Sequence, residues 1–395
     1  MATSPDIFIV GAARSAIGTF GGALKDVPLA DLATRVVRAA LERGGVDPAA
    51  VGHVVMGNVV PTEPRDAYLA RVAAVEAGIP HGTPAFNVNR LCGSGLQAIV
   101  SAVQTLRLGD AGIAVGAGAE SMSRGPYLLP AARWGARMGD SPAIDYTLGV
   151  LHDPFHRIHM GVTAENVAAQ EGITREMQDA FAVESQRRAA RAIAEGRFKS
   201  QIVPVEMASR KGTVVFDTDE HVRPDATVEQ LAKMRPAFKP DGTVTAGNAS
   251  GVNDGAAAVV LATGEAARQH GLKPLARIVS YGHAGVDPKV MGLGPVPATR
   301  LALERAGLSV KDLDIIESNE AFAAQACAVT RALDLDPAKV NPNGSGISLG
   351  HPIGATGAVL ATKAVYELQR TGGRYALMTM CIGGGQGIAV IIERV

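Results

Sequence analysis

The chain is organised around the stretch Asn87-Val88-Asn89-Arg90-Leu91-Cys92-Gly93-Ser94-Gly95-Leu96-Gln97-Ala98. A short extended run ends at Cys92, two glycines tighten a turn, and apolar residues then recur at three- and four-residue spacing, which predicts an amphipathic helix. The thiol therefore lies where a helix begins, and the unpaired N–H groups there favour an anion. Such a position should raise the thiolate fraction. On these residues alone, a reactive nucleophile and a small packed cysteine are equally good interpretations.

Composition narrows the class of protein. The chain has 395 residues, 47% hydrophobic and 19% charged, with 46 glycines, which is typical of an α/β protein of two or three domains. Zero formal net charge and 4% aromatic residues argue against nucleic-acid binding. No apolar run reaches the ~18 residues of a membrane span. The N-terminus lacks a signal-peptide layout, and three cysteines are too few for a disulfide framework or zinc module. We expect a cytoplasmic protein.

The order of predicted elements indicates a sheet covered by helices. The predicted strands are 6–11, 51–57, 113–118 and 257–261, and the predicted helices are 29–44, 63–78 and 174–196. Strands that alternate with helices predict a parallel sheet covered on both faces. Between 120 and about 251, prolines and scattered charges replace this alternation. We interpret that region as a subdomain inserted over the site and outside the sheet.

The C-terminal part of the chain repeats the N-terminal part. Ala-Leu-Glu-Arg-Gly-Gly-Val at 40–46 matches Ala-Leu-Glu-Arg-Ala-Gly-Leu at 302–308, an offset of 262 residues (302 − 40). The same offset places Gly95 on Gly357. A constant offset predicts two copies of one α/β unit, related by a pseudo-twofold axis. Equivalent turns of the two copies would then face each other across one cleft.

The second copy has its own polar turns. His351 precedes a predicted helix as Cys92 does, so a cysteine–histidine pair across the cleft is predicted, and nucleophilic catalysis needs such a base. The glycines of 383–387 suit an oxyanion hole, and Asn319 could hold a water or a carbonyl. Each feature alone has a structural explanation as a cap or turn. Their coincidence at matched ends of a repeat favours an active site.

Four sequence blocks carry a resemblance to a known family. They are Asn-x-x-Cys-Gly-Ser-Gly at 89–95, Asn-Glu-Ala-Phe at 319–322, Gly-His-Pro-Ile-Gly-Ala-Thr-Gly at 350–357 and Cys-Ile-Gly-Gly-Gly-x-Gly at 381–387. Together they resemble the signature blocks of the thiolases, and the likeness extends through 159–166 and 247–251 of the inserted region. Any one block would be unspecific, whereas the set is highly specific.

The resemblance implies a fold and a division of the chain. The fold is the thiolase-like α/β fold, with two duplicated βαβαβαββ halves in a five-layer α-β-α-β-α arrangement. Residues 1–121 plus 252–274 would form the N-terminal half, and 275–395 the C-terminal half. Residues 122–251 would form a loop domain that covers the coenzyme A (CoA) site. The resemblance also implies a homotetramer, a dimer of dimers.

The resemblance further implies an acyltransferase mechanism. Cys92, deprotonated by His351, would attack the 3-keto carbon of a 3-ketoacyl-CoA. Cys381 would protonate the departing enolate, and a second CoA would take the acyl group, with Claisen condensation as the reverse reaction. His351 with a water held by Asn319 would stabilise the enolate, and the N–H groups of Cys92 and Gly383 the acyl oxygen. CoA is then a substrate, and no permanently bound cofactor is expected.

By the same resemblance, a set of residues would line the CoA and pantetheine channel. They are Leu151, His159, Met160, Arg223, Phe238, Ala246, Ser250, Met291 and Phe322. Arg223 suits a phosphate.

Two departures bear on the substrate. Many short-chain acetyl-CoA acetyltransferases have Met in place of Gln386 and Gly-Ala-Ile-Ala in place of Ser-Gly-Ile-Ser at 345–348. The chain is more similar here to bacterial β-ketothiolases that accept acyl chains somewhat longer than acetoacetyl-CoA. A degradative 3-ketoacyl-CoA thiolase of fatty-acid β-oxidation, with the same chemistry, is the alternative.

The opening stretch also matches a dinucleotide-binding fingerprint. Residues 93–98 fit Gly-x-Gly-x-x-Gly/Ala, and Glu120 ends the next predicted strand, where a ribose ligand would lie. However, the fingerprint belongs to the first strand of its fold, and this strand is about the third. The Cys92 thiol would also crowd a pyrophosphate. The oxidoreductase interpretation is therefore disfavoured.

Three histidines, a cysteine and a glutamate also carry groups capable of chemistry. His152, His156 and His159 lack a carboxylate or thiol cluster that would complete a tetrahedral set, so no metal site is expected. Cys327 follows the pattern of a core helix residue. Glu320 either orients the site or caps a strand.

Two other functions fit the same fold. A ketoacyl synthase would carry two histidines rather than a histidine and a second cysteine at the matched turns. A non-catalytic acyl-CoA carrier would be expected to lose Cys92 or His351, and both are present.

Overall fold

The computed structural model describes residues 5–209 and 212–395. The strands are β1 (Ile7–Ser15), β2 (Gly18–Thr19), β3 (His53–Gly57), β4 (Ala85–Val88), β5 (Ile113–Ser121), β6 (Tyr127–Leu128), β7 (Ile144–Asp145), β8 (Ile202–Val203), β9 (Val205–Ser209), β10 (Gly212–Phe216), β11 (Asn253–Thr263), β12 (Ala276–Gly285), β13 (Ile315–Ser318), β14 (Tyr375–Ile382) and β15 (Gln386–Arg394). The helices are α1 (Leu29–Gly44), α2 (Leu69–Glu76), α3 (Ser94–Leu108), α4 (Tyr146–Val150), α5 (Met160–Glu171), α6 (Arg175–Ala194), α7 (Val228–Ala232), α8 (Gly264–Gln269), α9 (Pro295–Ala306), α10 (Ala323–Ala332), α11 (Gly346–Leu349) and α12 (Thr356–Thr371), with short 3₁₀ helices between them, among them η5 (Pro288–Leu293).

One sheet runs through both halves of the chain in the order β13-β14-β15-β12-β1-β11-β5-β3-β4. The halves join where β1 pairs with β12 over only two residue pairs. The sheet is mixed, so the prediction of a parallel sheet is wrong in part. β3, β4 and β5 are parallel, but β11 is antiparallel to β1 and β5. β14 and β15 are joined by a tight turn, which permits only antiparallel pairing.

The predicted repeat is confirmed by the element positions. β3 and β13 begin at His53 and Ile315, α3 and α12 at Ser94 and Thr356, and β5 and β14 at Ile113 and Tyr375, each pair 262 residues apart (315 − 53, 356 − 94 and 375 − 113).

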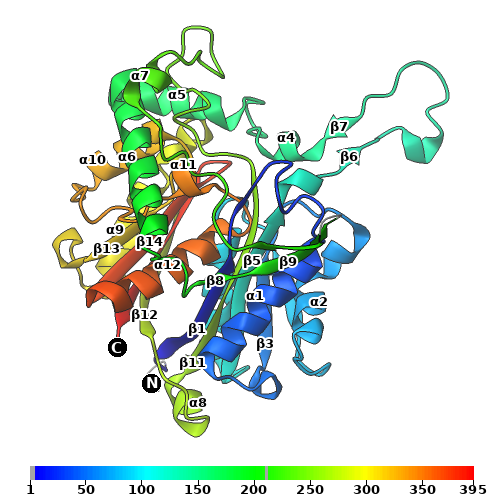
Figure 1. The fold of residues 1–395 in the computed structure, drawn as a ribbon, viewed down its shortest axis with the longest axis vertical. Coiled ribbons are helices and arrows are strands. Elements are labelled where there is room, and N and C mark those ends of the chain that lie inside the picture. The colour runs from blue at the N-terminus through cyan, green and yellow to red at the C-terminus, as the bar shows by residue number, and fades with distance from the viewer. Residues whose placement is uncertain (1–4, 210–211) are drawn as a thin grey trace.

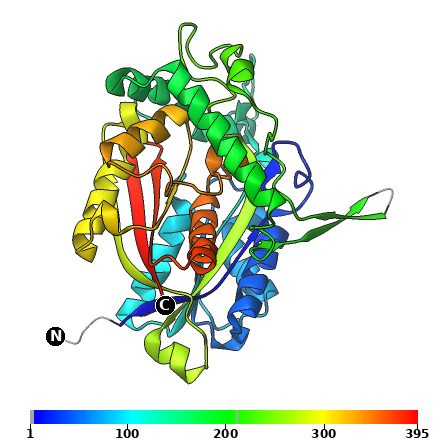
Figure 2. The ribbon, with the colours of Figure 1, turned by 60° about the vertical axis from the view of Figure 1, so that its left-hand side comes forward.

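Helices fill three layers around the two halves of the sheet. α1 packs on β1 and β11, α9 packs on β12 and β15, and α3 and α12 pack together between the halves. Figure 2 shows α12, in orange-red, between the red C-terminal strands and the yellow-green β11. This arrangement confirms the five-layer expectation.

The starts of α3 and α12 touch. A Cβ at Gly95 would lie 2.8 Å from the Ala358 nitrogen, and one at Gly357 would collide with the Leu96 backbone. Glycine at both positions therefore allows the two helix starts to meet. The turns that precede them, at Cys92 and His351, are brought to the same place.

The region between β5 and β11 forms helices over one end of the sheet and a projecting arm that contains β6 and β7 (Figure 1). The sequence predicts that this region lies outside the sheet, and this is wrong in part. Its strand β8 pairs with β1 at Arg14 and Ser15. A buried ion pair strengthens this attachment: the Arg14 guanidinium donates to both oxygens of Asp219, at 2.7 and 2.9 Å. Within the described ranges, no helix is long and apolar enough to cross a membrane.

Lys363 of α12 holds the second copy together from inside. Its Nζ donates to Glu317 Oε2 and to the Gly344 carbonyl, both at 2.6 Å, and both charged side chains are almost fully buried. Removing one partner of a buried pair leaves an uncompensated charge, which costs about 3–5 kcal/mol. We expect Lys363→Ala to lower the free energy of unfolding by that amount in urea titrations. Arg187→Ala, which breaks an exposed pair with Glu184, should cost less than about 1 kcal/mol. Equal losses would contradict the structural role of Lys363.

Candidate active site

The turn that carries Cys92 lies between β4 and α3, as predicted. Leu91 has a φ of +45°, a left-handed conformation that is uncommon for a residue other than glycine. The Ser94 hydroxyl accepts a hydrogen bond from the Arg90 N–H at 2.8 Å and donates to the Leu91 carbonyl at 2.7 Å. These bonds fix the turn, so that the Cys92 thiol is presented immediately before the first turn of α3.

The surroundings of Cys92 are mainly apolar. It packs against a cluster that contains Val60, Met122 and Ile353. Burial raises the pKa of the Cys92 thiol to about 11, although hydrogen bonds from the N–H groups of Gly383 and Cys92 itself oppose this rise. The expectation that the helix start enriches the thiolate is therefore wrong for the resting protein, because desolvation outweighs the amides. The thiol stays protonated until a base removes the proton.

His351 is a buried, neutral base. Its Nε2 lies 3.4 Å from Asn319 Nδ2, its Nδ1 lies 2.6 Å from Thr356 Oγ1, and its backbone N–H donates to Asn253 Oδ1 at 2.9 Å. Burial lowers the pKa of His351 to about 4, so the imidazole is uncharged near neutral pH. Asn319 and His351, which the sequence places in different turns, are thus brought together as predicted.

Cys381 and Gly383 occupy the end of β14 and the turn after it. Burial, followed by the nearby Cys92, raises the pKa of the Cys381 thiol well above its usual range. A Cβ at Gly383 would lie 3.0 Å from the Leu91 side chain and 3.5 Å from the Met160 sulfur. The Gly383 backbone is therefore held beside the Cys92 turn, and its N–H hydrogen-bonds the Cys92 sulfur.

Glu120 fixes one wall of the site. It is fully buried and accepts hydrogen bonds from the backbone N–H groups of Gly354 at 2.7 Å, Val60 at 3.0 Å and Val59 at 3.1 Å. Burial raises its pKa to about 8. The carboxylate joins the loop after His351 to a loop of the N-terminal half. It has no room for a ribose, so the dinucleotide interpretation of this strand end is wrong.

The contacts of Glu320 fit an orienting role better than a strand cap. Its carboxylate accepts hydrogen bonds from Ser185 Oγ at 2.6 Å and from Asn341 Nδ2 at 2.8 Å, and from the Ile347 N–H at 3.3 Å. These contacts connect Glu320, the neighbour of Asn319 in the chain, to α6 and to the segment before His351.

The residues proposed for CoA fall into three adjoining groups. Met160, Phe238, Met291, Phe322 and Cys381 share one apolar cluster. His159 stacks on Phe238 with ring centroids 4.7 Å apart. Arg223 and Ala246 line a cavity of about 390 Å³, which Ala249 connects to that apolar cluster. Ser250 donates its N–H to the Ala321 carbonyl at 2.9 Å, and Leu151 packs in the cluster that contains Cys92.

The three histidines of the inserted region have local partners. His152 Nδ1 lies 2.8 Å from the Leu148 carbonyl, and His156 Nδ1 lies 2.9 Å from Asp153. His159 caps α5 by accepting the Gly161 N–H at 3.0 Å. In the part of the chain that the structure describes, no three His, Cys, Asp or Glu side chains form a group that could hold a metal ion.

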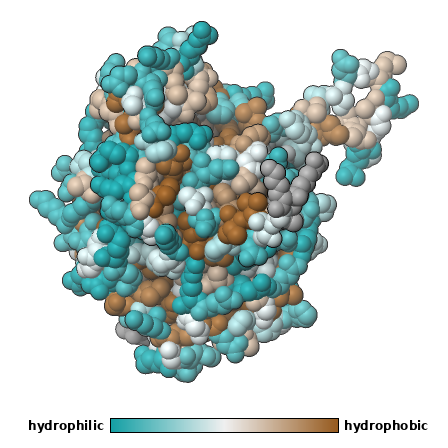
Figure 3. All heavy atoms as spheres, in the orientation of Figure 1, coloured by the Kyte–Doolittle hydropathy of each residue, from teal (hydrophilic) through white to brown (hydrophobic). Residues whose placement is uncertain are grey.

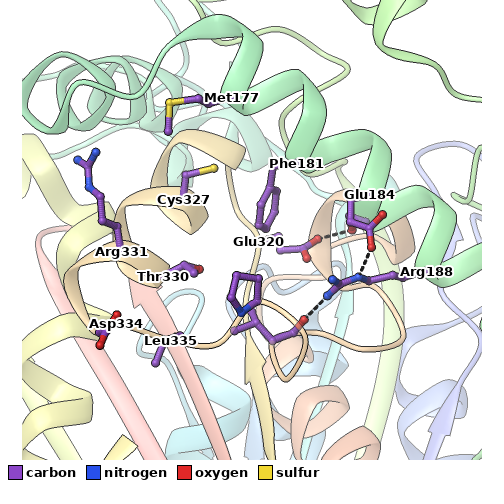
Figure 4. Close-up of a pocket in the computed structure, with 13 residues that line it drawn as sticks. Met177, Phe181, Glu184, Arg188, Glu320, Cys327, Thr330, Arg331, Asp334 and Leu335 are labelled. Carbon is purple, nitrogen blue, oxygen red and sulfur yellow. Dashed lines mark hydrogen bonds and ion pairs between the residues drawn. The ribbon is translucent and has the colours of Figure 1, made fainter.

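Cys327 lies apart from this chemistry, at the wall of a cavity of about 430 Å³ between α6 and α10 (Figure 4). The prediction that Cys327 is a core residue is confirmed in part, because its side chain is mostly enclosed but lines this cavity. Burial and then Glu320 raise the pKa of the Cys327 thiol to about 12. Phe181 and Met177 face the same cavity, whereas Cys92, His351 and Cys381 do not.

Comparisons with known proteins identify the family. Residues 7–265 match the model of the thiolase N-terminal domain, and residues 272–394 match that of the thiolase C-terminal domain. The chain belongs to the thiolase family. This thiolase is 68% identical to beta-ketothiolase BktB of Cupriavidus necator over 99% of both chains. It is 50% identical to acetyl-CoA acetyltransferase of Chromobacterium violaceum, over 98% of this chain and 100% of that one.

Solved structures agree with this assignment. Human mitochondrial 3-ketoacyl-CoA thiolase is 47% identical, with a TM-score of 0.98 over 100% of both chains. The same human protein has been solved in complex with CoA, with a TM-score of 0.97 over 100% of this chain and 99% of that one. The enzyme is therefore an acyltransferase, and the ketoacyl synthase and carrier interpretations are set aside.

Several residues that support the site were not singled out from sequence. Thr356 contacts His351, Asn253 holds the His351 backbone, and Ser185 contacts Glu320. Only Thr356 had a usable signal, because it lies inside the 350–357 block, five residues after His351. Ser185 comes from the inserted region, and nothing in its local sequence points to a contact with Glu320.

The reactivity of the Cys92 thiol in the resting enzyme should depend on pH. With the pKa of Cys92 raised to about 11, the thiolate fraction should rise about tenfold per pH unit between about pH 7 and pH 10. We expect the rate of Cys92 alkylation by iodoacetamide to rise in the same way, and acetyl-CoA to protect the thiol. The measurement is the second-order rate from peptide mass spectrometry. A rate that is flat from about pH 5 upward would instead indicate a resting thiolate–imidazolium pair.

Proposed function

We propose that this thiolase catalyses the reversible Claisen condensation of acetyl-CoA with an acyl-CoA to give a 3-ketoacyl-CoA and CoA, and the reverse thiolysis, through an acyl group on Cys92. Two pairings support this most strongly: Cys92 of the first copy lies near enough to Cys381 of the second to affect its thiol, and the neutral His351 imidazole lies beside the Asn319 amide. A nucleophile, a base and a second proton carrier are what this chemistry needs.

In thiolysis, the Cys92 proton moves to His351 Nε2 and the thiolate attacks the 3-keto carbon. The C2–C3 bond breaks, its electron pair forms the enolate of acetyl-CoA, and Cys381 gives its proton to C2. The thiol of an incoming CoA then loses its proton to the Cys381 thiolate. The CoA thiolate attacks the acyl group, and Cys92 leaves and recovers its proton from His351. Each thiol and the imidazole thus return to their starting forms.

Two oxyanions develop, so the reaction needs two sets of donors. The N–H groups of Cys92 and Gly383, which already hydrogen-bond the Cys92 sulfur, would stabilise the oxygen of the attacked carbonyl. His351 Nε2, protonated by Cys92, would stabilise the enolate oxygen together with a water held by Asn319. The 3.4 Å approach of Asn319 to His351 supports this second set.

CoA would reach the thiols along the three groups of residues described above. The cavity lined by Arg223 and Ala246 would take the polar end of CoA, with the Arg223 guanidinium as a partner for phosphate. The apolar cluster of Met160, Phe238 and Phe322 would hold the pantetheine near Cys381. The CoA complex of the human relative supports CoA binding by this fold, and the reaction above uses CoA as a substrate.

The substrate range that we propose extends somewhat beyond acetoacetyl-CoA. The full-length identity of 68% to a β-ketothiolase supports it, and so does the sequence departure at 345–348, a buried stretch at the start of α11. Gln386 adds little, because it is exposed. The test is thiolysis of acetoacetyl-CoA and 3-ketohexanoyl-CoA side by side. We expect both to be cleaved; cleavage of acetoacetyl-CoA alone would overturn the range, and cleavage of neither would overturn the function.

We also propose the division of the chain into three parts, 1–121 plus 252–274, 122–251 and 275–395.

We further propose that the protein is a cytoplasmic homotetramer. The projecting arm supports assembly into an oligomer, because Trp134 is 80% exposed and Met138 97% exposed at its tip. Figure 3 shows the arm standing clear of the body of the protein. Exposed large apolar side chains on such an arm are typical of a protein–protein contact. Sedimentation of the full chain would test this, and a monomer would contradict it.

A further inference from the structure

The Thr356 side chain hydrogen-bonds Nδ1, the inner ring nitrogen of His351. Its Oγ1 lies 2.6 Å from His351 Nδ1 and 2.9 Å from the carbonyl oxygen of Pro352. Both side chains are buried, at 3% and 4% exposure, so water does not replace these contacts. Within the described residues, no carboxylate is hydrogen-bonded to the His351 ring. A neutral hydroxyl therefore takes the place that an aspartate has in a serine-protease triad.

The chemistry of these groups fixes the direction of the hydrogen bonds once His351 is protonated. An imidazolium donates from both nitrogens, so Thr356 Oγ1 must accept from Nδ1–H. The single hydroxyl hydrogen is then free to point to the Pro352 carbonyl, which can only accept. On the other side of the ring, the Asn319 amide nitrogen faces Nε2 and can only donate, which matches an unprotonated Nε2 in the resting state.

Building on the proposed function, we propose that Thr356 is a positioning residue that keeps a proton on His351 Nδ1 throughout the reaction. The mobile proton then enters and leaves only at Nε2, the nitrogen that faces Asn319. In the first step, the Cys92 S–H bond breaks and an Nε2–H bond forms, while the Nδ1–H, Thr356 and Pro352 chain stays intact. Without the Thr356 hydroxyl, the other tautomer, with the proton on Nε2, would compete and could not accept the Cys92 proton there.

The test compares three variants on two residues of the same helix. Thr356→Val removes the hydroxyl at nearly constant volume, and Thr356→Ser keeps it. Thr362→Val is the matched control, because the buried Thr362 hydroxyl also bonds a carbonyl four residues earlier, that of Ala358 at 2.9 Å, but touches no histidine. We expect Thr356→Val to lower kcat for acetoacetyl-CoA thiolysis by about 10- to 100-fold, the range for groups that hydrogen-bond and orient metal-binding histidines, with little change in KM. Thr356→Ser and Thr362→Val should stay near wild type.

A structural defect alone would not change the histidine tautomer, so the second readout is nitrogen-15 NMR of histidine-labelled protein. The His351 signals are assigned by their absence in His351→Asn. We expect wild type and Thr356→Ser to carry the proton on Nδ1, and Thr356→Val to shift toward the Nε2-protonated form. A wild-type proton on Nε2, or equal losses of activity in Thr356→Val and Thr362→Val, would overturn the proposal. If the wild-type protein does not catalyse thiolysis at all, the proposed function is overturned instead. The NMR assignment of the His351 proton to Nδ1 or Nε2 would be unaffected.

Discussion

Cys92→Ala is expected to abolish thiolysis and condensation, with a loss of at least about 10⁴-fold in kcat. The magnitude follows from nucleophile deletions in other enzymes, where binding and oxyanion donors leave only a small residual rate. The measurement is cleavage of acetoacetyl-CoA in the presence of CoA. Because only the thiol is removed, the CoA cavity around Arg223 is unchanged, and binding of CoA should persist.

Cys327→Ala is the matched control for this loss. Cys327 is also a partly buried thiol, but it faces the cavity between α6 and α10 and lies outside the site. The variant should keep nearly wild-type activity. Substantial activity in Cys92→Ala, or equal losses in the two variants, would mean that Cys92 is not the nucleophile.

Cys381→Ser is expected to slow proton exchange at C2 of acetyl-CoA by about 10³-fold, within the range for loss of a general acid or base. A serine hydroxyl has nearly the shape of the thiol but is far less acidic, so it cannot carry the proton at C2. Exchange is followed by deuterium incorporation into the acetyl methyl in heavy water. Acylation of Cys92 by acetyl-CoA should remain largely intact, because CoA departs as a stable thiolate and needs no proton from Cys381 to leave.

This separation of the two thiols is what distinguishes the mechanism. If Cys381→Ser exchanges at the wild-type rate, Cys381 is not the acid or base at C2. If Cys92 acylation falls as far as exchange does, the substitution has disturbed the shared apolar surroundings rather than one chemical step.

The repeat made most of the fold predictable. Matched positions such as Gly95 and Gly357 gave the correct offset, and the equivalent strands and helices begin at that spacing. Strand direction was harder to predict, because β11 re-enters the sheet after the long inserted region and β15 re-enters it after a tight turn. Alternation of strands and helices describes crossover connections and does not report such returns.

The site residues were predictable from their blocks, but their protonation states were not. The sequence shows that Cys92 precedes a helix, which favours a thiolate, but it does not show the apolar cluster of Val60, Met122 and Ile353 that surrounds the sulfur. The sequence position of Glu120 suggests only a ribose ligand, because its actual partners are backbone N–H groups on two distant loops. Hydrogen bonds to backbone atoms leave no signature in sequence.

The central claim is that an acyl group is carried on Cys92, and the most direct measurement is peptide mapping after mixing the full-length protein with acetyl-CoA and acid quenching. We predict one acetylated peptide, containing Cys92, which persists in Cys381→Ser and is removed by added CoA. An acetyl group on Cys327 or Cys381, or no acetylated peptide, would contradict the account.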